Sequence, residues 1–130
     1  MTDDRERLAY VETAGSICWF IMDASWMLGI ATAAVILAVP TVLLAAASFR
    51  YVERTAAALF VTGAMLSWAC MNVAWMLHDT GIAREGLHAA TAFFVTGAAQ
   101  LLAALATARF ELGALETLLR RFRRMRIPKR

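Results

Sequence analysis

Charged residues are scarce in this chain, too scarce to cover the outside of a water-soluble protein of its size. Only 18% of the 130 residues are charged, whereas 61% are hydrophobic. A soluble domain needs polar side chains on its surface, but a chain surrounded by lipid can be apolar on its inner and outer faces alike. The composition therefore predicts an integral membrane protein.

Patterns that carry catalysis are also missing from the sequence. There is no glycine-rich phosphate loop, and no nucleophile, base and orienting group occur together. The two cysteines, Cys18 and Cys70, form no C-x-x-C pair, and we expect them to be buried free thiols. The sequence thus predicts a protein that is not an enzyme and has no recognised cofactor motif.

Apolar segments long enough to cross a bilayer make up most of the chain. Between Glu12 and Arg50 the only charged residue is Asp23. A single helix of that length would be roughly 55 Å long, whereas the hydrocarbon core is about 30 Å thick. Gly29 lies midway and is the expected turn. The predicted spans, 10–28, 31–49, 55–77 and 87–108, form a transmembrane domain over residues 1–108.

Basic residues predict how this domain is oriented. After four crossings, all but one of the thirteen Lys and Arg residues lie on the same side, and the exception is Arg84. Basic loops are retained in the cytoplasm. We therefore expect both termini in the cytoplasm, and we expect the membrane to be a bacterial plasma (inner) membrane.

The tail, residues 109–130, has a different pattern. Apolar residues recur every three or four positions from Leu112 to Met125, with arginines between them, and Pro128 follows. This pattern predicts an amphipathic helix lying on the anionic cytoplasmic leaflet. A docked cytoplasmic protein is the alternative partner, and nucleic acid is not expected, because the adjoining lipid accounts for the charge. The predicted membrane-surface residues are Arg120, Arg121, Arg123, Arg124 and Arg126.

One motif, W-x3-[D/N]-x2-W-M-L, occurs in both the first and the third predicted span. The two copies predict an all-α four-helix bundle made of two helical hairpins related by a parallel repeat. Spacings of three and four place the motif residues on one helix face. We expect the two faces to meet, with Asp23 hydrogen bonded to Asn72. The motif residues are Trp19, Asp23 and Trp26 in the first copy and Trp68, Asn72 and Trp75 in the second.

Asp23 is the residue within the spans that most needs an explanation. An ionised carboxylate facing lipid costs about 2.5–3.5 kcal/mol on insertion scales. In the leading interpretation, Asp23 and Asn72 form a structural clamp in a non-enzymatic scaffold or accessory subunit. In the alternative, Asp23 binds a small cation or proton in a transporter or channel, with Trp19 and Trp26 about a turn away.

Two further sites are possible on residue type alone. The indoles could bind a flat apolar molecule such as a quinone or a pigment, or they could simply fill the core and anchor the helix ends. His78 and His88 could share a metal ion with Asp79 and Glu85 nearby, although no recognised ligand spacing is present. Spans rich in Ala and Gly are also compatible with a homo-oligomer or a membrane protein complex.

Overall fold

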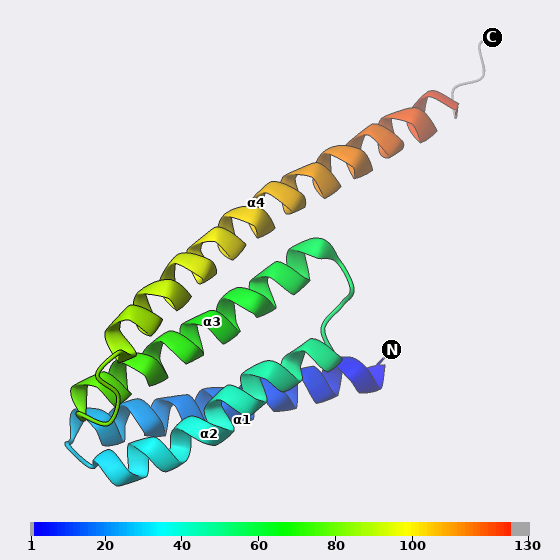
Figure 1. Cartoon of the computed structure of the whole chain (residues 1–130). Coiled ribbons are helices and arrows are strands. Elements are labelled where there is room, and N and C mark those ends of the chain that lie inside the picture. Colours follow the sequence, from blue (N-terminus) through cyan, green and yellow to red (C-terminus); the bar gives the residue numbers. More distant parts are fainter. Residues whose placement is uncertain (1, 126–130) are drawn as a thin grey trace.

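The computed structural model describes the backbone of residues 2–125 and the side chains of residues 3–110. Within that part the chain is all-helical and contains no strand. Its elements, shown in Figure 1, are α1 (Thr2–Met27), α2 (Ala31–Ala47), the short 3-10 helix η1 (Ser48–Arg50), α3 (Ala56–Asp79) and α4 (Gly86–Met125).

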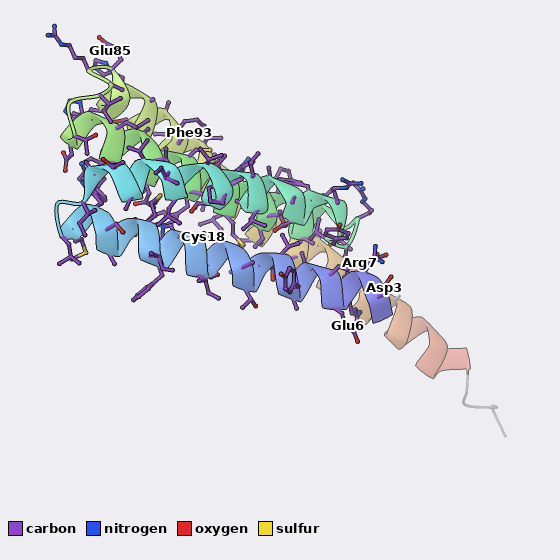
Figure 2. All side chains as sticks on the ribbon, turned by 90° about the horizontal axis from the view of Figure 1, so that it is seen from below. Asp3, Glu6, Arg7, Cys18, Glu85 and Phe93 are labelled. Carbon is purple, nitrogen blue, oxygen red and sulfur yellow. The ribbon has the colours of Figure 1, made fainter. Side chains whose placement is uncertain are left out.

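Three helical segments are long and apolar enough to cross a membrane, which indicates an integral membrane protein. They are Ala31–Arg50, Ala56–Asp79 and Gly86–Phe110. The predicted first span, 10–28, is helical but is not among the three. Figure 2 shows why α1 is less apolar: its N-terminal end carries charged side chains, including Asp3, Glu6 and Arg7.

The turn between α1 and α2 lies at Gly29, as predicted. Gly29 has φ +77°, which an L side chain rarely adopts. Its N–H donates to the carbonyl of Trp26 at 2.9 Å, and the N–H of Ile30 donates to the carbonyl of Ser25 at 2.8 Å. This pair of bonds is the Schellman ending of a helix, and it satisfies carbonyls that the end of α1 would otherwise leave unpaired.

The helices pack in chain order, α1 on α2, α2 on α3 and α3 on α4 (Figure 1). A pseudo-twofold axis relating the two hairpins would require α4 to pack on α1 as α2 packs on α3. In the described part of the chain α4 does not pack on α1. The helical hairpins are therefore present, but the closed, symmetric bundle that the repeat predicts is not confirmed.

Small residues bring α3 and α4 close together. A Cβ atom on Gly97 would lie 3.3 Å from the Cβ of Ser67, and one on Gly63 would lie 2.8 Å from Nε2 of Gln100. The hydroxyl of Ser67 also donates to Oε1 of Gln100 at 3.1 Å. Close backbone approach and an interhelical hydrogen bond are the interactions that hold helices together in lipid, where no hydrophobic drive acts between them.

The best-buried part of the molecule lies beside the Gly29 turn. Met22 and Met76 are fully buried there against Ala34 and Ala38, so that α1, α2 and α3 meet at this end. Cys18 and Cys70 are free, as predicted, but both are half-buried where full burial was expected. The two largest fully buried side chains therefore lie at this end, whereas most buried residues in the other half are smaller, such as Ala64, Ala69 and Ala104.

Helix α4 continues well beyond the predicted fourth span. It runs without a break from Gly86 to Met125, and its last part projects past the other helices in Figure 1. The residues after Phe110 extend it by about 22 Å at ~1.5 Å per residue. A tail that turns into the membrane plane at residue 109 is thus not seen. Arg120, Arg121, Arg123 and Arg124 lie on this extension, and Arg126 and Pro128 lie outside the described residues.

Candidate functional site

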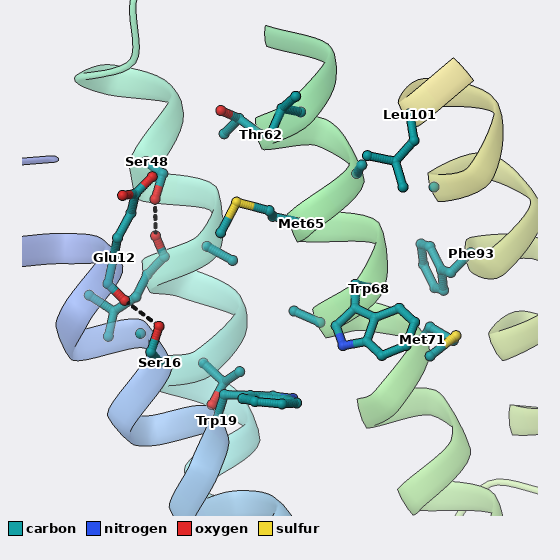
Figure 3. A pocket seen from close by; sticks show the side chains of 18 of the residues that line it. Glu12, Ser16, Trp19, Ser48, Thr62, Met65, Trp68, Met71, Phe93 and Leu101 are labelled. Atoms are coloured by element: carbon teal, nitrogen blue, oxygen red, sulfur yellow. Dashed lines mark hydrogen bonds between the residues drawn. The ribbon is translucent and has the colours of Figure 1, made fainter. Parts of the chain in front are cut away.

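A cavity of about 470 Å³ lies between the two hairpins, in the half of the molecule away from the Gly29 turn. All four α-helices contribute to its walls, and Figure 3 shows α1 and α2 on one side of it and α3 and α4 on the other. We call it the groove. Its lining residues are Val11, Glu12, Gly15, Ser16, Trp19, Thr41, Leu44, Ala45, Ser48, Val61, Thr62, Ala64, Met65, Trp68, Ala69, Met71, Phe93, Phe94, Gly97, Ala98 and Leu101.

The groove follows from how the helices pair. Gly15 would place a Cβ 3.4 Å from the Cβ of Leu44, so that α1 and α2 lie close together, and Gly97 does the same for α4 against α3. Between the two hairpins the closest backbone packing in the described residues is that of α2 on α3, and α1 touches α3 through side chains beside the Gly29 turn. A hollow is therefore left along the side where α1 and α4 do not meet.

Most hydroxyl groups in the groove are already hydrogen bonded to the backbone of their own helices. The hydroxyls of Ser16, Thr41, Ser48 and Thr62 each donate to the backbone carbonyl four residues earlier, at distances of 2.8 to 3.2 Å. A hydroxyl bonded in this way has no proton left to donate to a ligand. The walls therefore offer mainly carbon to an occupant, with the Glu12 carboxylate as the charged group among the lining residues.

The four tryptophans of the repeated motif divide into two pairs with different surroundings. Trp19 and Trp68 line the groove from α1 and α3. The N–H of Trp19 is buried and has no hydrogen-bond partner. Trp26 and Trp75 instead contact each other edge to face, with ring centroids 6.3 Å apart and an interplanar angle of 64°, a favourable aromatic geometry. Of the four predicted aromatic residues, one pair thus lines the groove, while the other pair joins α1 to α3; Trp19 and Trp26 both pack against the core.

The predicted hydrogen bond between Asp23 and Asn72 is wrong. The Nδ2 group of Asn72 donates to the carbonyl of Trp68 at 3.1 Å, and Oδ1 of Asp23 is buried without a partner. Helices α1 and α3 touch through the large side chains of Trp26 and Trp75, but their backbones lie farther apart than those of neighbouring helices. A short amide reaches the carbonyl one turn back on its own helix more easily than a group on another helix. Asp23 also lies outside the groove lining.

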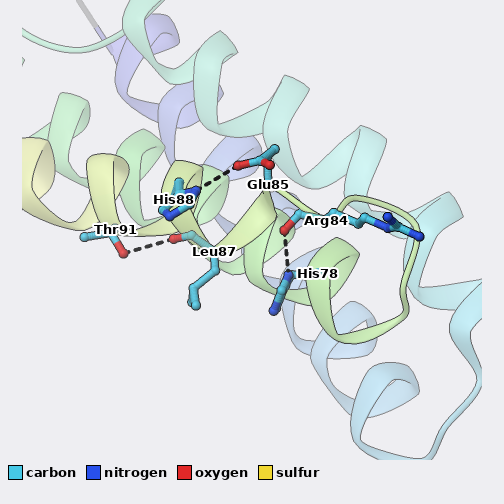
Figure 4. A network of polar contacts seen from close by, with 6 residues as sticks. All are labelled: His78, Arg84, Glu85, Leu87, His88 and Thr91. Atoms are coloured by element: carbon cyan, nitrogen blue, oxygen red, sulfur yellow. Dashed lines mark hydrogen bonds and ion pairs between the residues drawn. The ribbon is translucent and has the colours of Figure 1, made fainter.

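The two histidines do not share a site. Nδ1 of His88 contacts Oε2 of Glu85 at 2.8 Å, whereas Nδ1 of His78 lies 3.1 Å from the carbonyl of Arg84. Figure 4 shows the two imidazoles with these separate neighbours. Among the residues with described side chains, no three His, Cys, Asp or Glu residues are grouped to hold a metal. The weak metal prediction therefore has no support, because each imidazole has its own neighbour.

Several groove residues could not be identified as lining a cavity from the sequence. Phe93, Phe94 and Leu101 lie on one side of α4 at helical spacing, but such spacing also describes any lipid-facing helix. What makes them lining residues is the missing contact between α1 and α4. That feature belongs to the packing of whole helices and has no local signature.

Comparison of the chain with protein-family models, curated proteins and solved structures finds no match. Its function is therefore inferred from the geometry of the groove and of the helices around it.

Proposed function

We propose that the chain crosses the membrane four times, with α1 as the additional crossing and both termini in the cytoplasm of a bacterial inner membrane. α1 packs against α2, which is a candidate span. Its 26 residues give about 39 Å of helix, more than the ~30 Å that a crossing needs. Arg5 near its start lies 3.1 Å from Glu53 in the connection to α3. The start of α1 thus lies at the same end of the molecule as the basic residues Arg50 and Arg54.

We propose further that this protein is a non-enzymatic accessory subunit or scaffold that binds an apolar, membrane-soluble small molecule in the groove. Quinones and pigments are the classes that its aromatic walls favour. The observation that carries this proposal is the groove itself. Its volume of about 470 Å³ falls within the ~300–1,000 Å³ typical of small-molecule sites, which are mostly apolar with a few polar groups.

The route into the groove supports the same class of ligand. Because α1 and α4 do not pack together, the groove is open between these two helices. In a four-crossing arrangement this side faces the acyl chains of the bilayer. A molecule dissolved in lipid can then enter laterally, whereas a hydrated substrate would first have to leave water.

The direct experiment is a thermal titration of the purified protein in detergent with decylubiquinone. Its fully substituted ring does not add to Cys18 or Cys70. A ligand that binds only the folded state stabilises it by about 2.7 kcal/mol when its concentration is a hundred times Kd. We expect a saturable rise in Tm. An unchanged Tm up to the solubility limit of the quinone, together with no pigment extracted from the protein purified from its own membrane, would reject the proposal.

A cation or proton transporter remains a second candidate, because Oδ1 of Asp23 is buried within a predicted span without a partner. We expect Asp23→Asn to leave thermal stability nearly unchanged, since Asp23 has no hydrogen bond to lose. The transporter proposal also requires reconstituted wild-type protein to dissipate an imposed pH gradient and Asp23→Asn to abolish that flux. Glu12→Gln is the matched control. Equal rates in wild type, Asp23→Asn and empty liposomes would eliminate this candidate.

A further inference from the structure

The groove contains an unmet hydrogen-bond donor, the indole N–H of Trp19. It is buried, and no group among the residues that the structure describes accepts its proton. An indole nitrogen can only donate, so that a water or a ligand must supply the acceptor. Buried polar groups are nearly always paired in folded proteins, because an unpaired donor loses its bond to water and gains nothing in return.

We propose that the ligand of the groove carries an oxygen acceptor, as a quinone carbonyl does, and that this oxygen takes the Trp19 proton. This inference rests on the proposed function and narrows it. A hydrocarbon carotenoid or a lipid acyl chain would fill the groove but leave the donor unpaired. A quinone is apolar enough to reach the groove through lipid and also brings the oxygen.

Trp68 lines the groove on α3, across from Trp19 on α1. Figure 3 shows its indole nitrogen turned toward α1, with no hydrogen bond to any of the residues drawn there. The two indoles that occupy equivalent places in the repeated motif therefore line one cavity; Trp68 is 52% exposed, and the buried unpaired donor is that of Trp19. Trp26 and Trp75 lie outside the lining and pack on each other instead.

Other acceptors near Trp19 do not replace the ligand in this structure. Glu12 lies seven residues earlier on α1, about 10 Å along the helix axis, too far to accept the proton. Asp23 lies one turn further along α1, but its Oδ1 has no partner either. In the competing arrangement, the side chains of Trp19 and Asp23 rotate so that the indole N–H donates to the carboxylate. The Asp23→Leu variant tests this arrangement.

Depth distinguishes a quinone from a phospholipid. Glu12 lies near the start of the predicted span 10–28, and Trp19 lies about 10 Å farther along the helix than Glu12. That distance is about a third of the ~30 Å hydrocarbon core. A phospholipid places its ester oxygens near the headgroups, so that only its methylene groups reach the depth of Trp19. An oxygen at that depth requires a molecule that dissolves within the core.

Nuclear magnetic resonance of the indole N–H groups tests the proposal in detergent. The protein has four tryptophans and gives four indole signals, which single Trp→Phe variants assign. Decylubiquinone should move the Trp19 signal downfield and the Trp68 signal with it, and should leave Trp26 and Trp75 in place. Decylpentamethylbenzene, which has the same tail and no oxygen, should cause no downfield shift.

Affinity gives a second readout. Trp19→Phe should weaken decylubiquinone binding about tenfold more than it weakens decylpentamethylbenzene binding, whereas Trp75→Phe should affect neither. If both compounds raise Tm equally and Trp19 does not shift, the acceptor inference fails while binding in the groove holds. If Asp23→Leu moves the ligand-free Trp19 signal upfield, the donor is already paired within the protein and the inference is likewise overturned. If neither compound raises Tm, the proposed function itself fails.

Discussion

Replacing Ala45 with Phe should weaken decylubiquinone binding at least tenfold. Ala45 lines the groove from α2, and a benzyl group there would occupy the space that the ligand needs. Tenfold corresponds to about 1.4 kcal/mol of binding free energy. The loss is measured as the shift in the concentration of quinone that half-saturates the rise in Tm.

Ala46→Phe is the matched control, because Ala46 is the next residue on α2, is exposed and does not line the groove. It should bind the quinone as wild type does. If Ala45→Phe proves unstable, Ala98→Phe tests the same point from α4, where the residue is exposed and also lines the groove. Full affinity in both lining variants would place the ligand elsewhere.

Gly86→Val should be the most destabilising single change in the described part of the chain. A Cβ at Gly86 would overlap the carbonyl oxygen of Ala74 and would lie 2.9 Å from the Cβ of His78. Neither atom can move without shifting the α3 backbone. Overpacking of this kind costs about 1–3 kcal/mol and sometimes more, and we expect about 3 kcal/mol here.

The measurement is the midpoint of sodium dodecyl sulfate denaturation, followed by circular dichroism. Ala89→Val is the control for introducing a β-branched residue into the same helix, because Ala89 is exposed. It should change the free energy of unfolding by less than about 1 kcal/mol. Similar losses in both variants would mean that α3 and α4 do not approach as closely at Gly86 as the structure has them.

The helices and their first turn could be predicted because they depend on local chemistry. Long apolar segments bounded by charges indicate helices in lipid, and Gly29 is the residue best suited to the positive φ of a turn between two of them. The length of α4 was harder to predict. The change from apolar to basic residues near Arg109 marks a change of surroundings, but the backbone continues as helix across it.

The interior of the site could not be predicted in the same way. Periodicity places Asp23 on a helix face but does not say which neighbour that face meets. In the structure Met22, one residue earlier, is fully buried in the core, and Asn72 bonds its own helix. The groove depends on one pair of helices that fails to pack, α1 and α4, and such an absence leaves no pattern in the sequence.

The location of the N-terminus tests most directly whether the groove lies within the bilayer. If α1 crosses the membrane, it forms a wall inside the lipid. If only the three more apolar helices cross, α1 stays outside and the N-terminus lies on the side opposite to Arg50 and Arg54.

Labelling of single cysteines with a membrane-impermeant maleimide in spheroplasts decides between these arrangements. Asp3→Cys, in a background with Cys18→Ala and Cys70→Ala, should be protected until the membrane is permeabilised. Ile82→Cys, in the exposed turn between α3 and α4, should react at once. Immediate labelling at position 3 would contradict a groove walled by four membrane-spanning helices.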